Sequence, residues 1–209
     1  GPFWFWFALT TASLFLLLSG VSLVLSRSRS EKRGASFLKY LKRGLLIFSL
    51  GMLITFVTWL FIGSDFVLFG VLHLIGLSVI LSYPLVKNKN ASLVAGFLLI
   101  LAGVVLQGMR FGFSWLVWLG LKPVGYHSVD YFPLLPWLGV VLVGVFLGNV
   151  LLKNYGRTFA SVAGQNRAAR FLSFFGRHSL VIYLLHQPVI ILAFSAAGLI
   201  KFPVPSILF

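Results

Sequence analysis

The sequence predicts an all-α fold, a polytopic membrane bundle of about six transmembrane helices with one more, amphipathic helix on the cytoplasmic face. Of its 209 residues, 59% are hydrophobic and 10% are charged, and the mean hydropathy is +1.02. Soluble domains carry about 25% charged residues. Apolar stretches of about twenty residues, the length that crosses a bilayer, recur along the chain. Together these features indicate an integral membrane protein with a single transmembrane domain, residues 1–209.

The basic residues fix the expected orientation. The net charge is +14, and 14 of the 17 lysine and arginine residues lie on alternate connections between apolar stretches. This placement follows the positive-inside rule, so we expect those connections to be cytoplasmic and both ends of the 209-residue sequence to be outside. Because the charge lies on loops, it does not indicate a nucleic-acid partner. The three exceptions are Arg110, Lys122 and Lys201.

Each expected span is an apolar segment between these connections. The spans cover about 3–25, 44–62, 66–86, 91–109, 132–152 and 178–200. Residues 153–177 alternate apolar and basic positions at near-helical spacing, which predicts an amphipathic helix on the inner leaflet. In the outer connection 111–131, the segment FSWLVWLGL is too short to span and is expected at the interface.

Composition also excludes several kinds of chemistry. The chain has no cysteine and therefore no disulfide or thiolate nucleophile. Its three acidic residues are too few for a hard-cation cage or a paired-carboxylate mechanism, and we expect no metal site. Because the sequence lacks an initiator methionine and a charged leader, we expect it to be part of a longer protein.

The last span carries the first candidate site. Ser179, Tyr183 and His186 are spaced i, i+4 and i+7 and share one helix face. His186 lies about 12 Å inside the span, where an ionisable residue is costly and suggests function. It would act as a proton carrier, a general base or a ligand-binding donor. The alternative is an interhelical hydrogen bond that only stabilises the bundle.

The third span carries a second histidine, His73. Gly70 and Gly76 flank it at spacings of three, so another helix can approach the imidazole closely. This pattern suits a buried functional site, and it equally suits helix packing with one polar contact. On the fifth span, Gly144 and Gly148 form a GxxxG pattern that favours helix packing over chemistry.

Polar residues on the expected outer side form a third candidate. Asp65, Arg110, His127 and Asp130 would form an acceptor-binding site if the long outer connection folds over the bundle, with Asp130 orienting a histidine or a substrate amine. The alternative is a set of solvated loop residues. On the inner side, Lys42, Arg43 and Arg177 are candidates for holding the phosphates of a donor. The basic loop is otherwise a topology signal that contacts anionic lipid.

Several sequence blocks resemble a known family. The blocks are FLLLSGVSL (15–23), FGVLHLIGLSVILSYPL (69–85), VDYFPLLPWLGVVLVGVFLGN (129–149) and FFGRHSLVIYLLHQPV (174–189). They resemble, in this order, the catalytic-domain family of heparan-alpha-glucosaminide N-acetyltransferase in its prokaryotic branch, and DYFPLLPW and GRHSLVIYLLHQP are the most specific. The resemblance implies a prokaryotic cell membrane. Related proteins begin with a further span that carries an Asp-x-x-Arg-Gly motif and a histidine, before the point where this sequence starts.

This resemblance implies a function. Such proteins are similar in moving an acyl group from acetyl-CoA or another acyl-CoA to an acceptor across the membrane. It implies that His73, Asp130 and His186 line the transfer site, and that the acceptor is a glycan or small molecule with a sugar amine or hydroxyl. A proton-coupled transporter of a small solute and a non-catalytic membrane subunit are the alternatives. We expect membrane lipid as a partner and leave self-association open.

Overall fold

The computed structural model describes residues 2–31, 37–62, 65–109, 111–165 and 167–199. The chain divides into two compact units, Gly1–Lys153 and Asn154–Phe209, with the boundary inside the fifth α-helix. Among the residues that the structure describes, five helices are long and apolar enough to cross a membrane, namely α1, α2, α4, α5 and α7. The helices are α1 (Pro2–Glu31), α2 (Phe37–Ile62), α3 (Val71–Leu81), α4 (Lys89–Gln107), α5 (Leu134–Gln165), α6 (Arg167–Arg177) and α7 (Ser179–Ala196).

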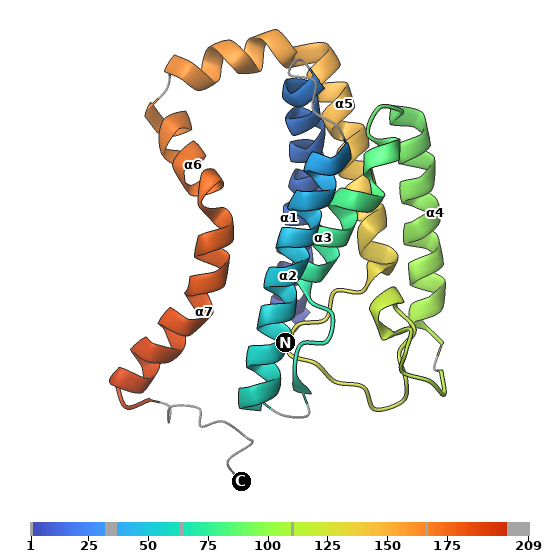
Figure 1. The fold of residues 1–209 in the computed structure, drawn as a ribbon, viewed down its shortest axis with the longest axis vertical. Helices are drawn as coiled ribbons and strands as arrows, with labels where there is room; N and C mark the ends of the chain where they lie inside the picture. Colours follow the sequence, from blue (N-terminus) through green and yellow to red (C-terminus); the bar gives the residue numbers. More distant parts are fainter. Residues whose placement is uncertain (1, 32–36, 63–64, 110, 166, 200–209) are drawn as a thin grey trace. The chain divides into compact units, whose positions relative to one another are not determined.

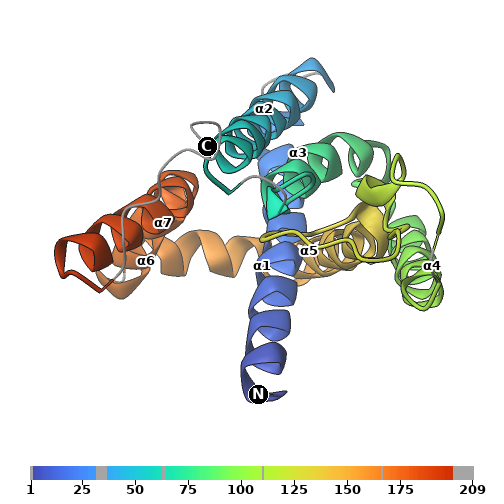
Figure 2. The same ribbon diagram turned by 90° about the horizontal axis from the view of Figure 1, so that it is seen from below.

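In the first unit, α5 is the central helix and lies between α1 and α4 (Figures 1 and 2). Half of its most apolar stretch is buried, against 11–22% for α1, α2 and α4. Glycines allow the close approach. A Cβ on Gly144 would collide with the carbonyl of Leu17 in α1, and a Cβ on Gly139 would lie 2.9 Å from the backbone nitrogen of Ile100 in α4. The prediction that the GxxxG pattern serves helix packing is therefore confirmed.

One end of this unit gathers basic residues, and we call it the basic end. Here Arg27 Nη1 donates to the carbonyl of Tyr83 at 2.9 Å, and Asn149 Nδ2 donates to the carbonyl of Val86 at 2.9 Å. These bonds join the last turns of α1 and the middle of α5 to the α3–α4 turn. A buried core lies beneath them and consists of Leu23, Val24, Tyr40, Val79, Val86 and Val145.

The expected third span, 66–86, is not one continuous helix. Its helical part, α3, has 11 residues, which extend about 16 Å at 1.5 Å per residue, whereas the hydrocarbon core is about 30 Å thick. Before it, Gly70 is extended, with φ −99° and ψ −172°. After it, Pro84 lies in a short 3₁₀ turn, Tyr83–Leu85. The expected span 66–86 thus contains a short helix flanked by non-helical residues, because hydropathy measures apolar length and not backbone conformation.

Other boundaries also differ from the expected spans. Helix α2 begins at Phe37, seven residues earlier than expected, and its first turns carry exposed Lys39 and Lys42. Helix α5 continues to Gln165, so the expected amphipathic helix 153–177 is divided between α5 and α6. Within the second unit, α7 follows α6 directly and contains Pro188.

Candidate functional site

The start of α3 is organised by a carboxylate from another part of the chain. Gly70 is the residue that precedes the helix, and it has no side chain to cap the free backbone N–H groups. Asp130 caps the helix instead, because its Oδ2 accepts a hydrogen bond from the N–H of Val71 at 3.1 Å. A carboxylate at a helix N-terminus is also stabilised by the helix dipole, by about 0.3–1 kcal/mol in exposed cases. A Cβ on Gly70 would collide with the same carboxylate oxygen.

His73 completes this helix start from inside. Its Nδ1 accepts a hydrogen bond from the N–H of Gly70 at 3.2 Å, as the glutamate of a capping box does. A backbone N–H only donates, so Nδ1 carries the lone pair and the neutral imidazole holds its proton on Nε2. The Nε2–H faces Thr55 Oγ1 of α2 at 3.4 Å. The arrangement therefore fixes one tautomer, and a second proton on Nδ1 would break the bond to Gly70.

The surroundings of His73 are apolar and tight. The side chain is 1% exposed. Phe48 meets the imidazole edge-on, with ring centroids 5.1 Å apart, and Phe69 stacks on it at 5.4 Å. A Cβ on Gly51 would lie 2.9 Å from Nδ1, so only glycine leaves room for the ring. We call these residues the His73 site: Phe48, Gly51, Thr55, Phe69, Gly70, His73 and Asp130.

Two segments distant in sequence are joined beside this site. The N–H of Val129 donates to the carbonyl of Asp65 at 3.1 Å, and the N–H of Phe132 donates to the carbonyl of Phe69 at 3.0 Å. Ser128 Oγ adds a bond to the carbonyl of Phe66 at 3.0 Å. The block 128–132 thus lies along the block 65–70, which places Asp130 at the start of α3.

The candidate residues of the expected outer side differ in their location and exposure. Asp130 is half-buried within the His73 site, whereas the side chains of Asp65 and His127 are exposed. Arg110 lies outside the described residues. His73 and Asp130 are therefore brought together at Gly70 and Val71, and His127 is placed on the nearby surface.

The sequence did not indicate the structural role of Tyr131. Its hydroxyl donates to the carbonyl of Val117 at 2.7 Å, and the ammonium of Lys122 lies 4.4 Å from its ring centroid. Burial, with the neighbouring Tyr126 as a smaller cause, raises the pKa of the Tyr131 phenol. The phenol therefore remains a neutral donor that ties the outer connection to the block carrying Asp130.

An apolar groove of about 530 Å³ lies against the His73 site. Two of its walls, Phe48 and Phe69, are the rings that contact His73. Trp115 and Trp118 of the outer connection form another part of the lining. The groove is thus bounded by the aromatic rings that contact His73. Its mostly apolar lining suits an apolar part of a ligand.

The candidates of the last span lie in the second unit. His186 is exposed in α7, and its Nδ1 lies 2.6 Å from the carbonyl oxygen of Tyr183. A carbonyl oxygen only accepts, so Nδ1 carries the proton and Nε2 of the neutral ring carries the lone pair. Ser179 is exposed at the first position of the helix and Tyr183 is half-buried. His186 thus holds the tautomer opposite to that of His73.

The predicted donor residues are all exposed. Lys42 and Arg43 lie on the first turns of α2 at the basic end, and Arg177 ends α6. Across the described ranges, no group of three or more histidine, aspartate or glutamate side chains is placed to hold a metal ion.

Five membrane-length apolar helices within the described ranges define the class: an integral, polytopic helical membrane protein. Within that class, the chain belongs to the family described as heparan-alpha-glucosaminide N-acetyltransferase, catalytic, whose family model matches residues 1–188. The matched range contains His73, Asp130 and His186. Comparison with curated proteins and with solved structures gives no significant match.

Proposed function

We propose that this protein is a membrane-embedded acyltransferase that moves an acetyl or other acyl group from acyl-CoA to the amine or hydroxyl of a sugar acceptor. The observation that carries the proposal is the family match over residues 1–188, because the family description names an N-acetyltransferase. Membership in this family supports acetyl-CoA as the donor and a glycan or small molecule as the acceptor in this proposal.

His186 is the group that we propose as the base. Its Nε2 has the free lone pair, because the bond to Tyr183 keeps the proton on Nδ1. As the acceptor nitrogen or oxygen attacks the thioester, its new bond to the acyl carbon forms, the C–S bond breaks, and Nε2 takes the acceptor's proton. The imidazolium then returns that proton to the departing thiolate. The alternative is transient attack on the thioester by Nε2 itself.

The other predicted residues have supporting parts in this proposal. In this proposal His73 and Asp130 belong to the transfer machinery as residues that hold the start of α3, because each accepts a hydrogen bond from its backbone. Ser179 and Tyr183, on the face of His186, and Asp65, Arg110 and His127 would bind the acceptor. Lys42, Arg43 and Arg177 would attract the phosphates of the donor before it binds.

Acyl transfer by the purified full-length protein tests this proposal. Labelled acetyl-CoA is supplied to the protein in lipid nanodiscs with an amino sugar, with its N-acetylated form, or with no acceptor. The expected result is labelled product from the amino sugar, with a matching release of free CoA thiol. Failure to consume any acyl-CoA, together with pH-dependent solute flux in proteoliposomes, would contradict the proposal and favour a transporter.

A further inference from the structure

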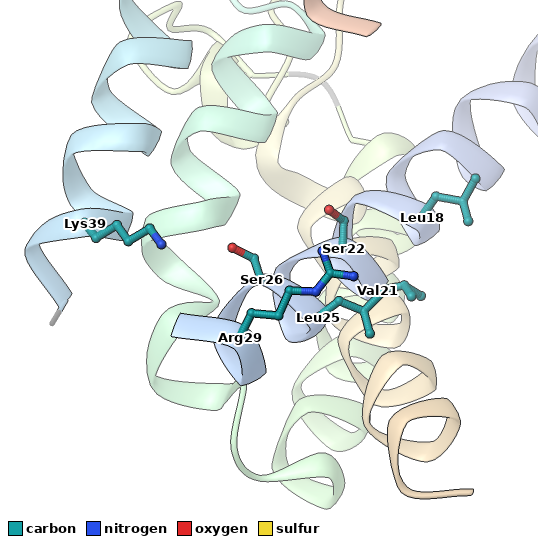
Figure 3. A pocket seen from close by; sticks show the side chains of 7 residues that line it. All are labelled: Leu18, Val21, Ser22, Leu25, Ser26, Arg29 and Lys39. Carbon is teal, nitrogen blue, oxygen red and sulfur yellow. The ribbon is translucent and has the colours of Figure 1, made fainter. Parts of the chain in front are cut away.

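A second groove lies at the basic end between α1 and α2, and we call it the basic groove (Figure 3). Its volume is about 540 Å³. From α2, it is lined by Lys39, whose ammonium points towards Ser26 (Figure 3). From α1, it is lined by Leu18, Val21, Ser22, Leu25, Ser26 and Arg29.

The polar part of the groove suits an anionic oxygen group. Ser22, Ser26 and Arg29 are spaced i, i+4 and i+7, so they share one face of α1. The guanidinium of Arg29 reaches back beside Ser22 (Figure 3). Two cations and two hydroxyls thus converge from two helices. An anionic oxygen group between Arg29 and Lys39 would accept charge-assisted hydrogen bonds from both side chains.

Polarity changes along the groove in the way that it changes along a lipid. Arg29 and Lys39 lie at the basic end, which the charge pattern assigns to the cytoplasmic face. Leu18 is 11 residues before Arg29, or about 16 Å deeper along the helix, close to half the hydrocarbon thickness. Leu18 and Val21 line the deepest part, Leu25 lies at the depth of Ser22 and Ser26 on the neighbouring face of α1, and the Leu18 side chain is 64% exposed. The groove therefore spans one leaflet, from charged to aliphatic.

We propose that the basic groove binds one anionic phospholipid of the cytoplasmic leaflet. Its phosphate lies between Arg29 and Lys39, where Ser22 and Ser26 add hydrogen bonds. One acyl chain follows Leu25, Val21 and Leu18 towards the membrane midplane. The aliphatic depth favours a lipid over a CoA phosphate group, because the nucleotide of CoA would need water where the groove offers hydrocarbon. This site is independent of the proposed acyl transfer.

Lipid titration tests the site in the full-length protein. Retention of phosphatidylglycerol is measured by native mass spectrometry against a background of phosphatidylcholine. We expect the double variant Arg29→Gln, Lys39→Gln to weaken binding roughly 25-fold, since each charge-assisted contact to the phosphate contributes about five-fold in affinity. The matched control, Lys89→Gln with Lys153→Gln, removes two exposed charges from the same end outside the groove and should change binding less than about three-fold.

A variant that keeps all charges separates a groove from a surface potential. Val21→Trp fills the aliphatic part, so it should reduce phosphatidylglycerol retention as strongly as the double variant does. Equal losses in the double variant and in its control, or full retention in Val21→Trp, would overturn the proposal. Displacement of the lipid by CoA or by adenosine 3′,5′-bisphosphate would overturn it as well and would assign the groove to the acyl donor.

Discussion

At the scale of residues, His73 and His186 hold their protons on opposite ring nitrogens. The difference arises from their partners, since Nδ1 of His73 receives a backbone N–H and Nδ1 of His186 faces a backbone carbonyl. His73 is also 1% exposed, whereas His186 is exposed. His73 is therefore built as a structural acceptor, and His186 has the free lone pair that a base requires.

Replacing His73 tests its part in holding the start of α3. His73→Ala leaves the buried N–H of Gly70 without its acceptor and empties the space between Phe48 and Phe69. We expect a loss of about 2–4 kcal/mol in the free energy of unfolding, measured by denaturation in detergent. His73→Asn supplies an acceptor oxygen and should recover part of this loss. The exposed control His127→Ala should leave stability unchanged, and equal stability of all three variants would contradict the account.

Asp130 is tested by separating its hydrogen bond from its charge. Asp130→Ala removes the acceptor for the N–H of Val71 and should cost about 0.5–2 kcal/mol of stability, as the loss of a helix cap does. Asp130→Asn keeps an acceptor oxygen and should retain most of the stability and most of the acyl-transfer rate. A fully folded Asp130→Asn protein that lacks activity would instead make this carboxylate a catalytic group.

The sequence suggested His73 and Asp130 as site residues but not how they meet. Their shared contact at Gly70 and Val71 depends on the pairing of 128–132 with 65–70, segments that are about sixty residues apart. Residue type and helical spacing carry no information about such a pairing. The neighbours Gly51 and Thr55 were missed for the same reason, because the register between α2 and α3 is a tertiary property.

At the scale of elements, small residues set the distances between helices. Gly44 of α2 and Gly76 of α3 face each other, and a Cβ on Gly76 would lie 2.7 Å from the carbonyl of Gly44. A Cβ on Gly144 of α5 would likewise collide with the carbonyl of Leu17 in α1. In a bilayer, such packing replaces the hydrophobic effect as the main attraction between helices.

A single methyl group at Gly144 should therefore separate α1 from α5. We expect Gly144→Ala to destabilise the protein by about 1–3 kcal/mol, because the added Cβ meets backbone atoms that cannot move aside. The measurement is the midpoint of thermal unfolding in detergent. Gly112→Ala is the matched control, since a Cβ at Gly112 has open space around it. Equal midpoints for the two variants would show that α1 and α5 do not pack in this way.

The sequence predicted the spans that form one continuous helix. It did not predict the conformation of the span that includes non-helical residues. Hydropathy located α1, α2, α4, α5 and α7, because their apolar stretches match the membrane thickness. It misplaced helix ends, since charged residues continue a helix beyond the hydrocarbon. It also joined the non-helical segment 66–70 to α3, because an apolar segment has the same hydropathy in either conformation.

At the scale of the whole molecule, the alternation of basic connections predicts which end faces the cytoplasm. In the first unit, the starts of α2 and α4 lie at the basic end, and the segment 128–132 lies at the opposite end beside residues 65–70 (Figure 1). The arrangement within this unit therefore agrees with the charge pattern.

Thiol labelling tests this orientation, since the 209 residues contain no cysteine. Lys42→Cys and Lys89→Cys should react with a membrane-impermeant thiol reagent only after the cells are permeabilised. His127→Cys should react in intact cells, because its side chain is exposed at the opposite end. Labelling of Lys89→Cys in intact cells would reverse the predicted topology.

The rate of acetyl transfer in two histidine variants tests the central claim most directly. His186 and His178 are both exposed in the second unit, and each has Nδ1 bound to a backbone carbonyl of the preceding turn. In the full-length protein, we predict that His186→Ala lowers the single-turnover rate roughly 100-fold or more, while His178→Ala stays within about two-fold of the parent. A folded His186→Ala protein that transfers acetyl groups at the parent rate would contradict the account.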